Sequence, residues 1–289
     1  MNSLSKDSGR QECLPHLAIA GCQLAPRPVV CDNKQRMCIF SVIYRVVPEC
    51  PVLVLTNRDE STERPSVPPQ VFTAGEKRCR WFGGADSRAG GTWFGINEHG
   101  LLAAVTNRKK EPLPPNPRSR GLLCRDVLGH ATATAAVDWV LQELSAHAYA
   151  GFNLMILTVE AAWIIEAADS TSATQIGPAI HSVSNGPLSA DDDPRVNLAQ
   201  SLVTRMVDEE QDWKAYIDRA RQICGVHASD GTPGMCLHRD GWGTVGSTIV
   251  ALASDPQQSQ YHYAAGSPCR TAYVDYSDAF RSFASGGRF

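Results

Sequence analysis

Residues 37–60 read Met37-Cys-Ile-Phe-Ser-Val-Ile-Tyr-Arg-Val-Val-Pro-Glu-Cys-Pro-Val-Leu-Val-Leu-Thr-Asn-Arg-Asp-Glu60. Two apolar runs rich in β-branched and aromatic residues are separated by two prolines, so the pattern predicts a strand, a turn and a second strand. Cys38 stands at the start of the first strand. Arg58 and Asp59 follow the second strand where it leaves the core, so the hairpin should present a thiol and two charged side chains at its open end.

The rest of the chain mixes strand-like and helix-like segments. A second hairpin is predicted over residues 92–106, with its turn at Asn97-Glu-His-Gly100. Apolar residues at three- and four-residue spacing predict the helices. The expected elements are strands at 92–96, 101–106, 152–159, 162–167, 180–183, 247–254 and 261–265, and helices at 119–130, 132–146 and, as a pair, 194–224. This order predicts an α+β fold of antiparallel hairpins packed with helices.

Residues 1–36 carry no sustained hydrophobic period, so we expect a poorly ordered N-terminal extension. A single domain is expected over residues 37–289. The absence of a pattern before Met37 favours this residue as the translation start, in which case methionine aminopeptidase exposes Cys38. A start at Met1 requires instead a processing cut between Met37 and Cys38.

Composition and charge argue against several classes of protein. The formal net charge of −3 argues against a nucleic-acid-binding protein, which usually carries a clearly basic surface. No apolar run reaches the roughly 18 residues of a membrane helix, so no integral membrane segment is expected. Asp7, Glu12 and Pro15 interrupt the pattern of a secretory signal. We therefore expect a cytoplasmic protein.

The ten cysteines are scattered along the chain without a C-x-x-C pair. This spacing argues against a structural zinc site, so no metal site is expected. In a chain of this length the cysteines are interpreted as mostly buried or free thiols of a reducing compartment.

Cys38 becomes a candidate nucleophile if it is the mature N-terminal residue. It then carries both a thiol and an α-amine, whose ordinary pKa of about 7.7 to 8.0 suits a base near neutral pH. Arg58 and Asp59 would hold the amine, orient a substrate and stabilise the thiolate. The alternatives are a small apolar side chain in a strand for Cys38 and a solvated turn for Arg58 and Asp59.

Asparagines follow two further predicted strands, at Asn107 and Asn185. Their amides donate hydrogen bonds without charge, which suits an oxyanion formed when a thiolate attacks an amide carbonyl. Taken singly, each asparagine is more typical of a turn. Their occurrence at strand ends, together with Cys38, Arg58 and Asp59, favours a catalytic site.

The chain resembles the NRDE family, whose eukaryotic members are the transport and Golgi organization 2 proteins. The matching motifs are Met37-Cys-Ile-Phe40, Thr56-Asn-Arg-Asp-Glu-Ser61, Gly90-Gly-Thr-Trp-Phe-Gly-Ile-Asn97, Ala104-Val-Thr-Asn107, Arg118-Ser-Arg-Gly-Leu122, Gly151-Phe-Asn-Leu154 and Ser184-Asn-Gly-Pro187. They recur in order from residue 37 to about residue 254. Each motif alone is weak, but the set is specific.

That family is similar to the N-terminal nucleophile hydrolases of the bile-salt and penicillin acylase kind. The resemblance implies a four-layer α/β/β/α sandwich of two antiparallel sheets. It also implies a cofactor-independent amidase or acyltransferase that acts on linear amide bonds. Carried over by motif, the nucleophile falls on Cys38, the acylase Arg and Asp near Arg58 and Asp59, and the oxyanion or substrate asparagines on Asn107 and Asn185.

Two departures from the family pattern affect these assignments. The acylase Arg and Asp are separated by two residues, whereas Arg58 and Asp59 adjoin, so either Asp59 or Glu60 is the orienting carboxylate. Relatives commonly carry arginine after a late Gly-Thr pair, where this chain has Val245. The second cation that this arginine would bring to the site therefore has no counterpart at Val245, and the effect of this difference does not follow from the sequence.

The resemblance also implies an alternative function. The eukaryotic relatives are associated with Golgi organisation, lipid handling and haem movement, so the ligand is then haem or a lipid rather than a small amide. Candidate haem ligands are His99, His130, His147, His181 and His238. A third hypothesis is a member that keeps the fold without the activity. The substrate and the oligomeric state do not follow from the sequence.

Overall fold

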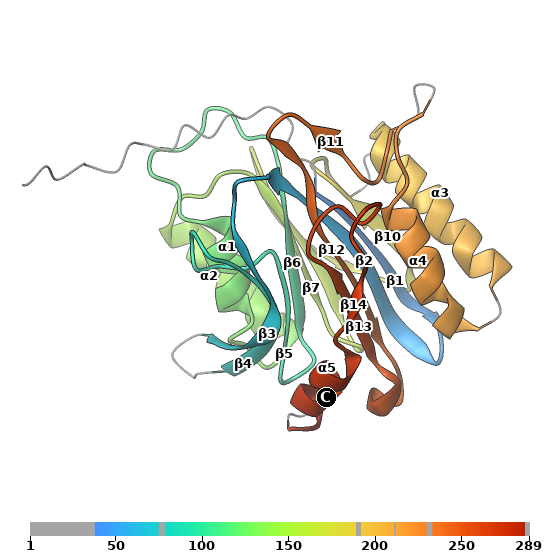
Figure 1. The fold of residues 1–289 in the computed structure, drawn as a ribbon. Coiled ribbons are helices and arrows are strands. Elements are labelled where there is room, and N and C mark those ends of the chain that lie inside the picture. Colours follow the sequence, from blue (N-terminus) through green and yellow to red (C-terminus); the bar gives the residue numbers. More distant parts are fainter. Residues whose placement is uncertain (1–37, 75–78, 189–191, 211, 230–232, 287–289) are drawn as a thin grey trace, which may run out of the picture. The chain divides into compact units, whose positions relative to one another are not determined.

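The computed structural model describes residues 38–74, 79–188, 192–210, 212–229 and 233–286. The predictions made for residues 1–36, and for Met37 itself, lie outside these residues. The described part folds into two antiparallel sheets with helices on their outer faces (Figure 1).

The first sheet holds the Cys38 hairpin. Its strands pair in the order β10-β1-β2-β12-β13-β14, and β11 also pairs with β12. The bounds are β1 (Ile39–Val47), β2 (Cys50–Ser61), β10 (Ala179–Val183), β11 (His238–Arg239), β12 (Trp242–Leu252), β13 (Gln260–Ala264) and β14 (Val274–Asp275).

The second sheet is a meander in which every strand pairs with its neighbours in sequence, β3-β4-β5-β6-β7-β8-β9. The bounds are β3 (Ser66–Ala74), β4 (Cys79–Asp86), β5 (Phe94–Asn97), β6 (Leu102–Asn107), β7 (Phe152–Leu157), β8 (Ala162–Ala167) and β9 (Thr171–Ile176).

The helices complete four layers. Figure 1 shows α3 and α4 outside the first sheet and α1 and α2 outside the second. The bounds are α1 (Arg120–Val127), α2 (Ala133–Ala146), α3 (Pro194–Glu209), α4 (Tyr216–Cys224) and α5 (Ser277–Ser285), with short 3₁₀ helices at Trp213–Ala215 and Pro256–Gln258.

Three buried apolar clusters match the three spaces between four layers. Phe40 of β1 and Met155 of β7 belong to the cluster between the sheets. Ile43 of the same strand β1 packs instead in the cluster with α3 and α4, because successive strand residues face opposite sides. A third cluster joins the second sheet to α1 and α2. The α+β fold predicted from the sequence pattern and the α/β/β/α sandwich implied by the family resemblance are both confirmed.

Several elements were absent from the sequence-based prediction. Strand β3 contains Pro68 and Pro69 and lies at a sheet edge, where proline is tolerated. Strand β9, at the other edge, exposes most of its residues and so lacks an apolar alternation. Helix α5 was also missed; it inserts Phe280 and Phe283 into the cluster between the sheets. Strands β4, β11 and β14 complete the set of missed elements.

Candidate active site

Cys38 directly precedes β1. The neighbouring strand β10 ends beside it, whereas β2 continues to Ser61 and pairs there with β12. Arg58 and Asp59, expected after the end of the second strand, therefore lie within β2. The antiparallel register pairs Ile39 with Asn57 on one side and Phe40 with Val183 on the other. Continued to Cys38, this register places Arg58 on one flank and Asn185 on the other. The strand topology therefore brings together three residues far apart in the sequence.

The Cys38 thiol contacts the backbone of Asp59. Its Sγ accepts a hydrogen bond from the Asp59 N–H at 3.4 Å and lies 3.7 Å from the Asp59 carbonyl oxygen, to which it donates. Burial, reinforced by the Asp59 carboxylate, raises the pKa of the Cys38 thiol to about 11, while the Asp59 N–H and the Arg58 charge act in the opposite direction. With Met37 attached, this thiol is therefore protonated at neutral pH.

Arg58 is a buried cation with spare hydrogen-bonding capacity. Its side chain is 6% exposed, and its guanidinium lies 4.3 Å above the ring centroid of Trp93. The Nη1 atom is buried and has no hydrogen-bond partner among the residues that the structure describes. Because an unsatisfied buried donor is costly, this nitrogen is suited to receive an acceptor group of a ligand.

The Asp59 carboxylate is held by two other residues. Arg195 Nη1 donates to Oδ2 at 2.8 Å, and the Thr244 hydroxyl donates to Oδ1 at 2.5 Å. Burial raises the pKa of the Asp59 carboxyl, and Arg195 and Thr244 partly offset that rise. Asp59 thus contacts the Cys38 thiol through its backbone, while its side chain anchors β2 to its surroundings.

Glu60, the alternative orienting carboxylate, pairs elsewhere. Arg64 Nη1 lies 3.3 Å from Glu60 Oε2, and the same arginine also binds Asp86. The Glu60 Oε1 atom accepts from the N–H of Ser61. Of the two carboxylates considered, Asp59 is the buried one.

Ser184 connects Asn185 and Asn107 to Cys38. The Ser184 hydroxyl oxygen lies 3.0 Å from the Cys38 carbonyl oxygen and 3.2 Å from Asn185 Oδ1, and its single hydrogen can be donated to either acceptor. The Ser184 carbonyl accepts from the hydroxyl of Thr106, the residue before Asn107, at 2.7 Å. This contact joins the ends of β10 and β6, so it links the two sheets beside Cys38. Both Asn107 and Asn185 are half-buried.

Asn153 of β7 holds the same turn from the second sheet. Its buried amide donates to the carbonyls of Ser184 at 3.1 Å and Gly186 at 2.9 Å, and to Thr106 Oγ1 at 3.3 Å. Asn57, the first residue of the Asn-Arg-Asp-Glu motif, plays a comparable part on the other flank, donating to the carbonyls of Cys224 and Met235. Through their amide nitrogens, these two asparagines hold backbone segments on either side of Cys38.

Sequence reasoning missed Arg195, Thr244, Ser184 and Asn153. Ser184 and Asn153 stand inside motifs quoted above, and Thr244 directly precedes Val245. In these motifs only Asn107, Asn185 and the valine were considered as site residues. Arg195 gave no such signal, because a single arginine in the first turn of a helix looks like a surface charge. Here Asp193 caps α3 by accepting from the Arg195 N–H, and the arginine side chain points inward, 1% exposed.

Val245 occupies a β-bulge. Thr244 pairs with Asp59 and Gly246 with Arg58, so Val245 is the additional residue on β12. Its side chain is half-buried. Val245, where the family resemblance implies an arginine, therefore lies opposite the Arg58-Asp59 pair.

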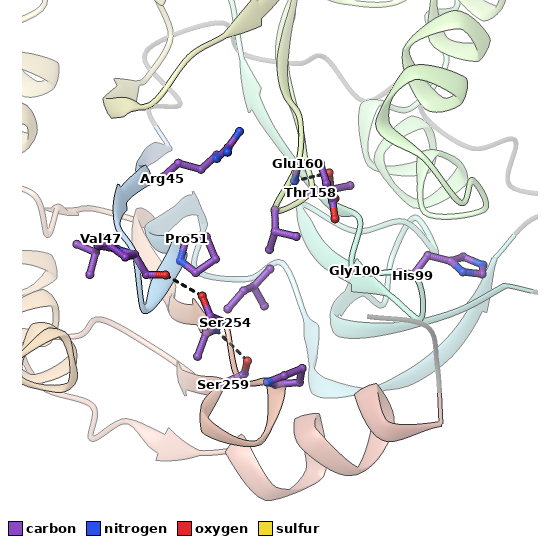
Figure 2. A pocket seen from close by; sticks show the side chains of 14 residues that line it. Arg45, Val47, Pro51, His99, Gly100, Thr158, Glu160, Ser254 and Ser259 are labelled. Carbon is purple, nitrogen blue, oxygen red and sulfur yellow. Dashed lines mark hydrogen bonds between the residues drawn. The ribbon is translucent and has the colours of Figure 1, made fainter.

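A pocket of about 640 Å³ lies at the opposite end of the strands (Figure 2). Its walls include Arg45 and Val47 from the end of β1, His99 from the β5–β6 turn, Glu160 from the β7–β8 turn and Leu252 from the end of β12. Since β1 begins beside Cys38 and ends at this pocket, the two sites are separated by the length of the strand. No candidate catalytic residue lines it.

Two groups of potential metal ligands occur among the described residues. His227, Cys236, His238 and Cys269 have ligand atoms within 4.8 Å of one another, and Cys79, Glu98 and His99 form the second group. Glu98 already pairs with Arg80 at 2.9 Å. The seven described cysteines are all free thiols. In the described part of the chain, no helix combines the length and the apolar character needed to cross a membrane.

Solved structures with a similar chain trace include one bacterial and one nematode hydrolase. Conjugated bile acid hydrolase from Clostridium perfringens aligns with a TM-score of 0.49 and 12% identity over 83% of this chain and 93% of its own. The Caenorhabditis elegans ortholog of N-acylethanolamine-hydrolyzing acid amidase aligns with a TM-score of 0.48 and 13% identity, over 73% and 91%. These values are low, so the fold assignment rests on the layers and strand order described above.

Sequence comparison gives a closer relationship. The bovine transport and Golgi organization protein 2 homolog is 32% identical over 114 residues, which are 38% of this chain and 40% of the bovine protein. The human homolog is 30% identical over 105 residues, 36% of this chain and 37% of the human protein. The chain thus matches about two fifths of the length of these relatives. The profile of the Transport and Golgi organisation 2 family matches residues 37–258. That match spans most of the chain, which therefore belongs to the Transport and Golgi organisation 2 family.

Proposed function

We propose that the chain is a cysteine amidase or acyltransferase of the N-terminal nucleophile kind, acting on linear amide bonds. The observation that carries the proposal is the position of Cys38, whose thiol hydrogen-bonds the Asp59 backbone between the flanking residues Arg58 and Asn185. Thiol, cation and amide donor are the groups that attack on an amide carbonyl needs.

Each group has a defined part in the reaction. Once Cys38 is N-terminal, its α-amine takes the thiol proton and the sulfur attacks the carbonyl carbon of the substrate. Asn107 and Asn185 donate to the oxyanion. The C–N bond breaks, the leaving amine takes the proton from the α-ammonium, and a thioester remains. Water or an acceptor amine then attacks the thioester and releases the acyl group, regenerating the thiol.

Arg58 is the substrate-binding cation in this proposal. Its Nη1, buried and without a hydrogen-bond partner in the described part of the chain, suits an acceptor oxygen near the scissile amide, and the guanidinium lies against the ring of Trp93. Asp59 and Arg195 keep β2 positioned, so Asp59 acts on the thiol through its backbone N–H. N-acyl amino acids combine a linear amide with a carboxylate and are the first substrates to test.

The test compares two forms of the protein. A fusion partner whose removal leaves Cys38 as the first residue is compared with the chain that retains Met37. We expect turnover of N-acyl amino acids, and a thioester adduct on Cys38 by mass spectrometry, only in the form that begins at Cys38. Cys38→Ala should abolish both, and Cys79→Ala, at a buried thiol elsewhere in the fold, should leave both unchanged. Equal turnover by the Cys38→Ala variant would refute the proposal.

A second candidate is a non-enzymatic carrier of haem or a lipid. The observation that favours it is the 640 Å³ pocket, which combines His99 and Arg45 with the apolar residues Val47, Val159 and Leu252. An imidazole offers an axial ligand for haem iron. Haem titration tests this candidate: stoichiometric binding that survives Cys38→Ala but is lost in His99→Ala supports carriage at this pocket. His147→Ala, at an exposed histidine outside the pocket, is the control.

A further inference from the structure

Four side chains from three separate segments converge beside the candidate active site. His227 follows α4, Cys236 and His238 flank the start of β11, and Cys269 lies between β13 and β14. We propose that these residues bind one zinc ion in a structural Cys₂His₂ site. This proposal is independent of whether Cys38 is catalytic.

The distances among the ligand atoms of Cys236, His238 and Cys269 are within about 0.1 Å of the range for tetrahedral zinc, and all four ligand atoms lie within 4.8 Å of one another. Zinc–sulfur bonds of about 2.3 Å and zinc–nitrogen bonds of about 2.0 to 2.1 Å imply ligand separations of roughly 3.3 to 3.8 Å in a tetrahedron. Cys236 Sγ lies 3.5 Å from Cys269 Sγ and 3.6 Å from His238 Nε2, and His238 Nε2 lies 3.2 Å from Cys269 Sγ. The His227 ring packs against the His238 ring with centroids 5.2 Å apart.

Contacts of the neighbouring backbone hold the segments that carry these four side chains in place. The Cys236 N–H donates to the Val226 carbonyl at 2.8 Å, which places Cys236 next to the segment that carries His227. Gly234 permits the approach, since a Cβ there would lie 2.5 Å from the Ala228 nitrogen and 2.9 Å from the His227 carbonyl carbon. The Ser267 hydroxyl donates to the Thr244 carbonyl and so fixes the loop that leads to Cys269.

The chemistry of the four ligands also fits zinc. Binding displaces one proton from each thiol to solvent, and two thiolates then neutralise the ion. A neutral cluster suits this location, where Cys236 is buried and the two histidines are exposed. Four protein ligands leave no open coordination position for a substrate, so the site is structural rather than catalytic.

The site would brace the residues that hold Asp59. Met235, adjacent to Cys236, accepts hydrogen bonds from Arg195 and Asn57 through its carbonyl. Leu237, between the two ligands of the β11 segment, donates its N–H to Thr244 Oγ1 at 2.9 Å. Zinc would therefore fix the backbone that supports Arg195 and Thr244.

Metal analysis of the untagged full chain tests the proposal. After purification from zinc-supplemented cells and dialysis, we expect about one zinc per chain. Cobalt exchanged for zinc should give the ligand-field absorption of a tetrahedral ion together with a sulfur-to-cobalt charge-transfer band. Cys269→Ser, His227→Ala and His238→Ala should each weaken zinc binding more than about tenfold. Circular dichroism checks that each variant folds. Because His227 and His238 are exposed, we expect their alanine variants to fold.

A matched control distinguishes this site from the other ligand group. Cys79→Ser removes a thiol from the group with Glu98 and His99 and should leave zinc content and the cobalt spectrum unchanged. A wild-type chain that binds neither zinc nor cobalt overturns the proposal, whether Cys236 and Cys269 are then found as free thiols or as a disulfide. Zinc retained equally by Cys269→Ser and His238→Ala overturns it as well.

Discussion

Arg195 Nη1 lies 2.8 Å from Asp59 Oδ2, in an ion pair whose side chains are 1% and 0% exposed. The same guanidinium also donates to the carbonyls of Gly234 and Met235. One residue at the start of α3 thus joins the helix layer, the end of β2 and the segment before β11. The position of Cys38 depends on this junction, because its thiol contacts the Asp59 backbone.

Removing Arg195 should strongly destabilise the fold. In Arg195→Met the Asp59 carboxylate stays buried without its cation, so the free energy of unfolding should fall by about 3 to 5 kcal/mol. Chemical denaturation measures this loss. Adding Asp59→Asn in the same chain removes the uncompensated charge and should restore part of the stability. The surface pair of Arg219 and Glu209 is the control, and Arg219→Met should cost less than about 1 kcal/mol. Equal losses at both arginines would contradict the assignment.

The Cys38 thiol should alkylate slowly at neutral pH while Met37 is attached. Burial raises its pKa to about 11, and only the thiolate reacts, so the rate should increase about tenfold per pH unit up to that value. Mass spectrometry of the Cys38 peptide after iodoacetamide treatment follows this residue alone. In the form that begins at Cys38, the α-amine should bring the inflection to lower pH. An inflection below pH 9 in the chain that retains Met37 would contradict this reading.

Alkaline pH should destabilise the fold through its buried thiols. Burial raises the pKa of Cys50 from 9.0 to about 12, so above pH 9 the unfolded chain loses this proton while the folded chain keeps it. The stabilisation is complete below pH 9 and declines by about 1.4 kcal/mol per pH unit above it. Urea unfolding of wild type and Cys50→Ala between about pH 9 and pH 11, in reductant, should show a shallower slope for the variant. Parallel slopes would refute the assignment.

Asn153 should affect the turn at residues 184–186 more than overall stability. Asn153→Leu leaves the carbonyls of Ser184 and Gly186 without this donor, at a cost of about 1 to 3 kcal/mol, and should speed hydrogen exchange in the turn. Asn97 is a matched buried asparagine whose amide donates to two carbonyls after α1. Asn97→Leu should cost similar stability without altering exchange at residues 184–186. A similar exchange pattern in both variants would contradict the role of Asn153.

Sequence periodicity predicted most of the strands and helices because both sheets are built mainly from strands with strong apolar patterns, whereas the four-layer arrangement followed from the family resemblance. Helices α1 to α4 and strands such as β1, β6 and β7 lie where alternation or helical spacing placed them. The edge strands β3 and β9 escaped because an edge strand buries little and tolerates proline. Helix α5 escaped because Phe280 and Phe283 form only a short apolar stripe.

Near the candidate site, too, some residues could be found from the sequence and others could not. Cys38, Arg58, Asp59, Asn107 and Asn185 were visible because motifs follow predicted strands. Arg195 was not, since its partner Asp59 lies 136 positions earlier and no local pattern reports such a pairing. The proximity of His227, Cys236, His238 and Cys269 could not be predicted for a related reason. Cysteine spacing reports only pairs that are close in sequence, whereas three separate segments carry these four side chains.

The hydroxyl of Thr244 that binds Asp59 comes from a residue 185 positions further along the chain. During synthesis, β2 leaves the ribosome long before β12, the strand beside it in the finished sheet. Domains fold as units once their partner segments are available, so Asp59 cannot be fixed until Thr244 has emerged. An enzyme that trims the chain before Cys38 during translation would therefore act on an unfolded segment, and the Cys38 thiol would be exposed before the residues around it are in place.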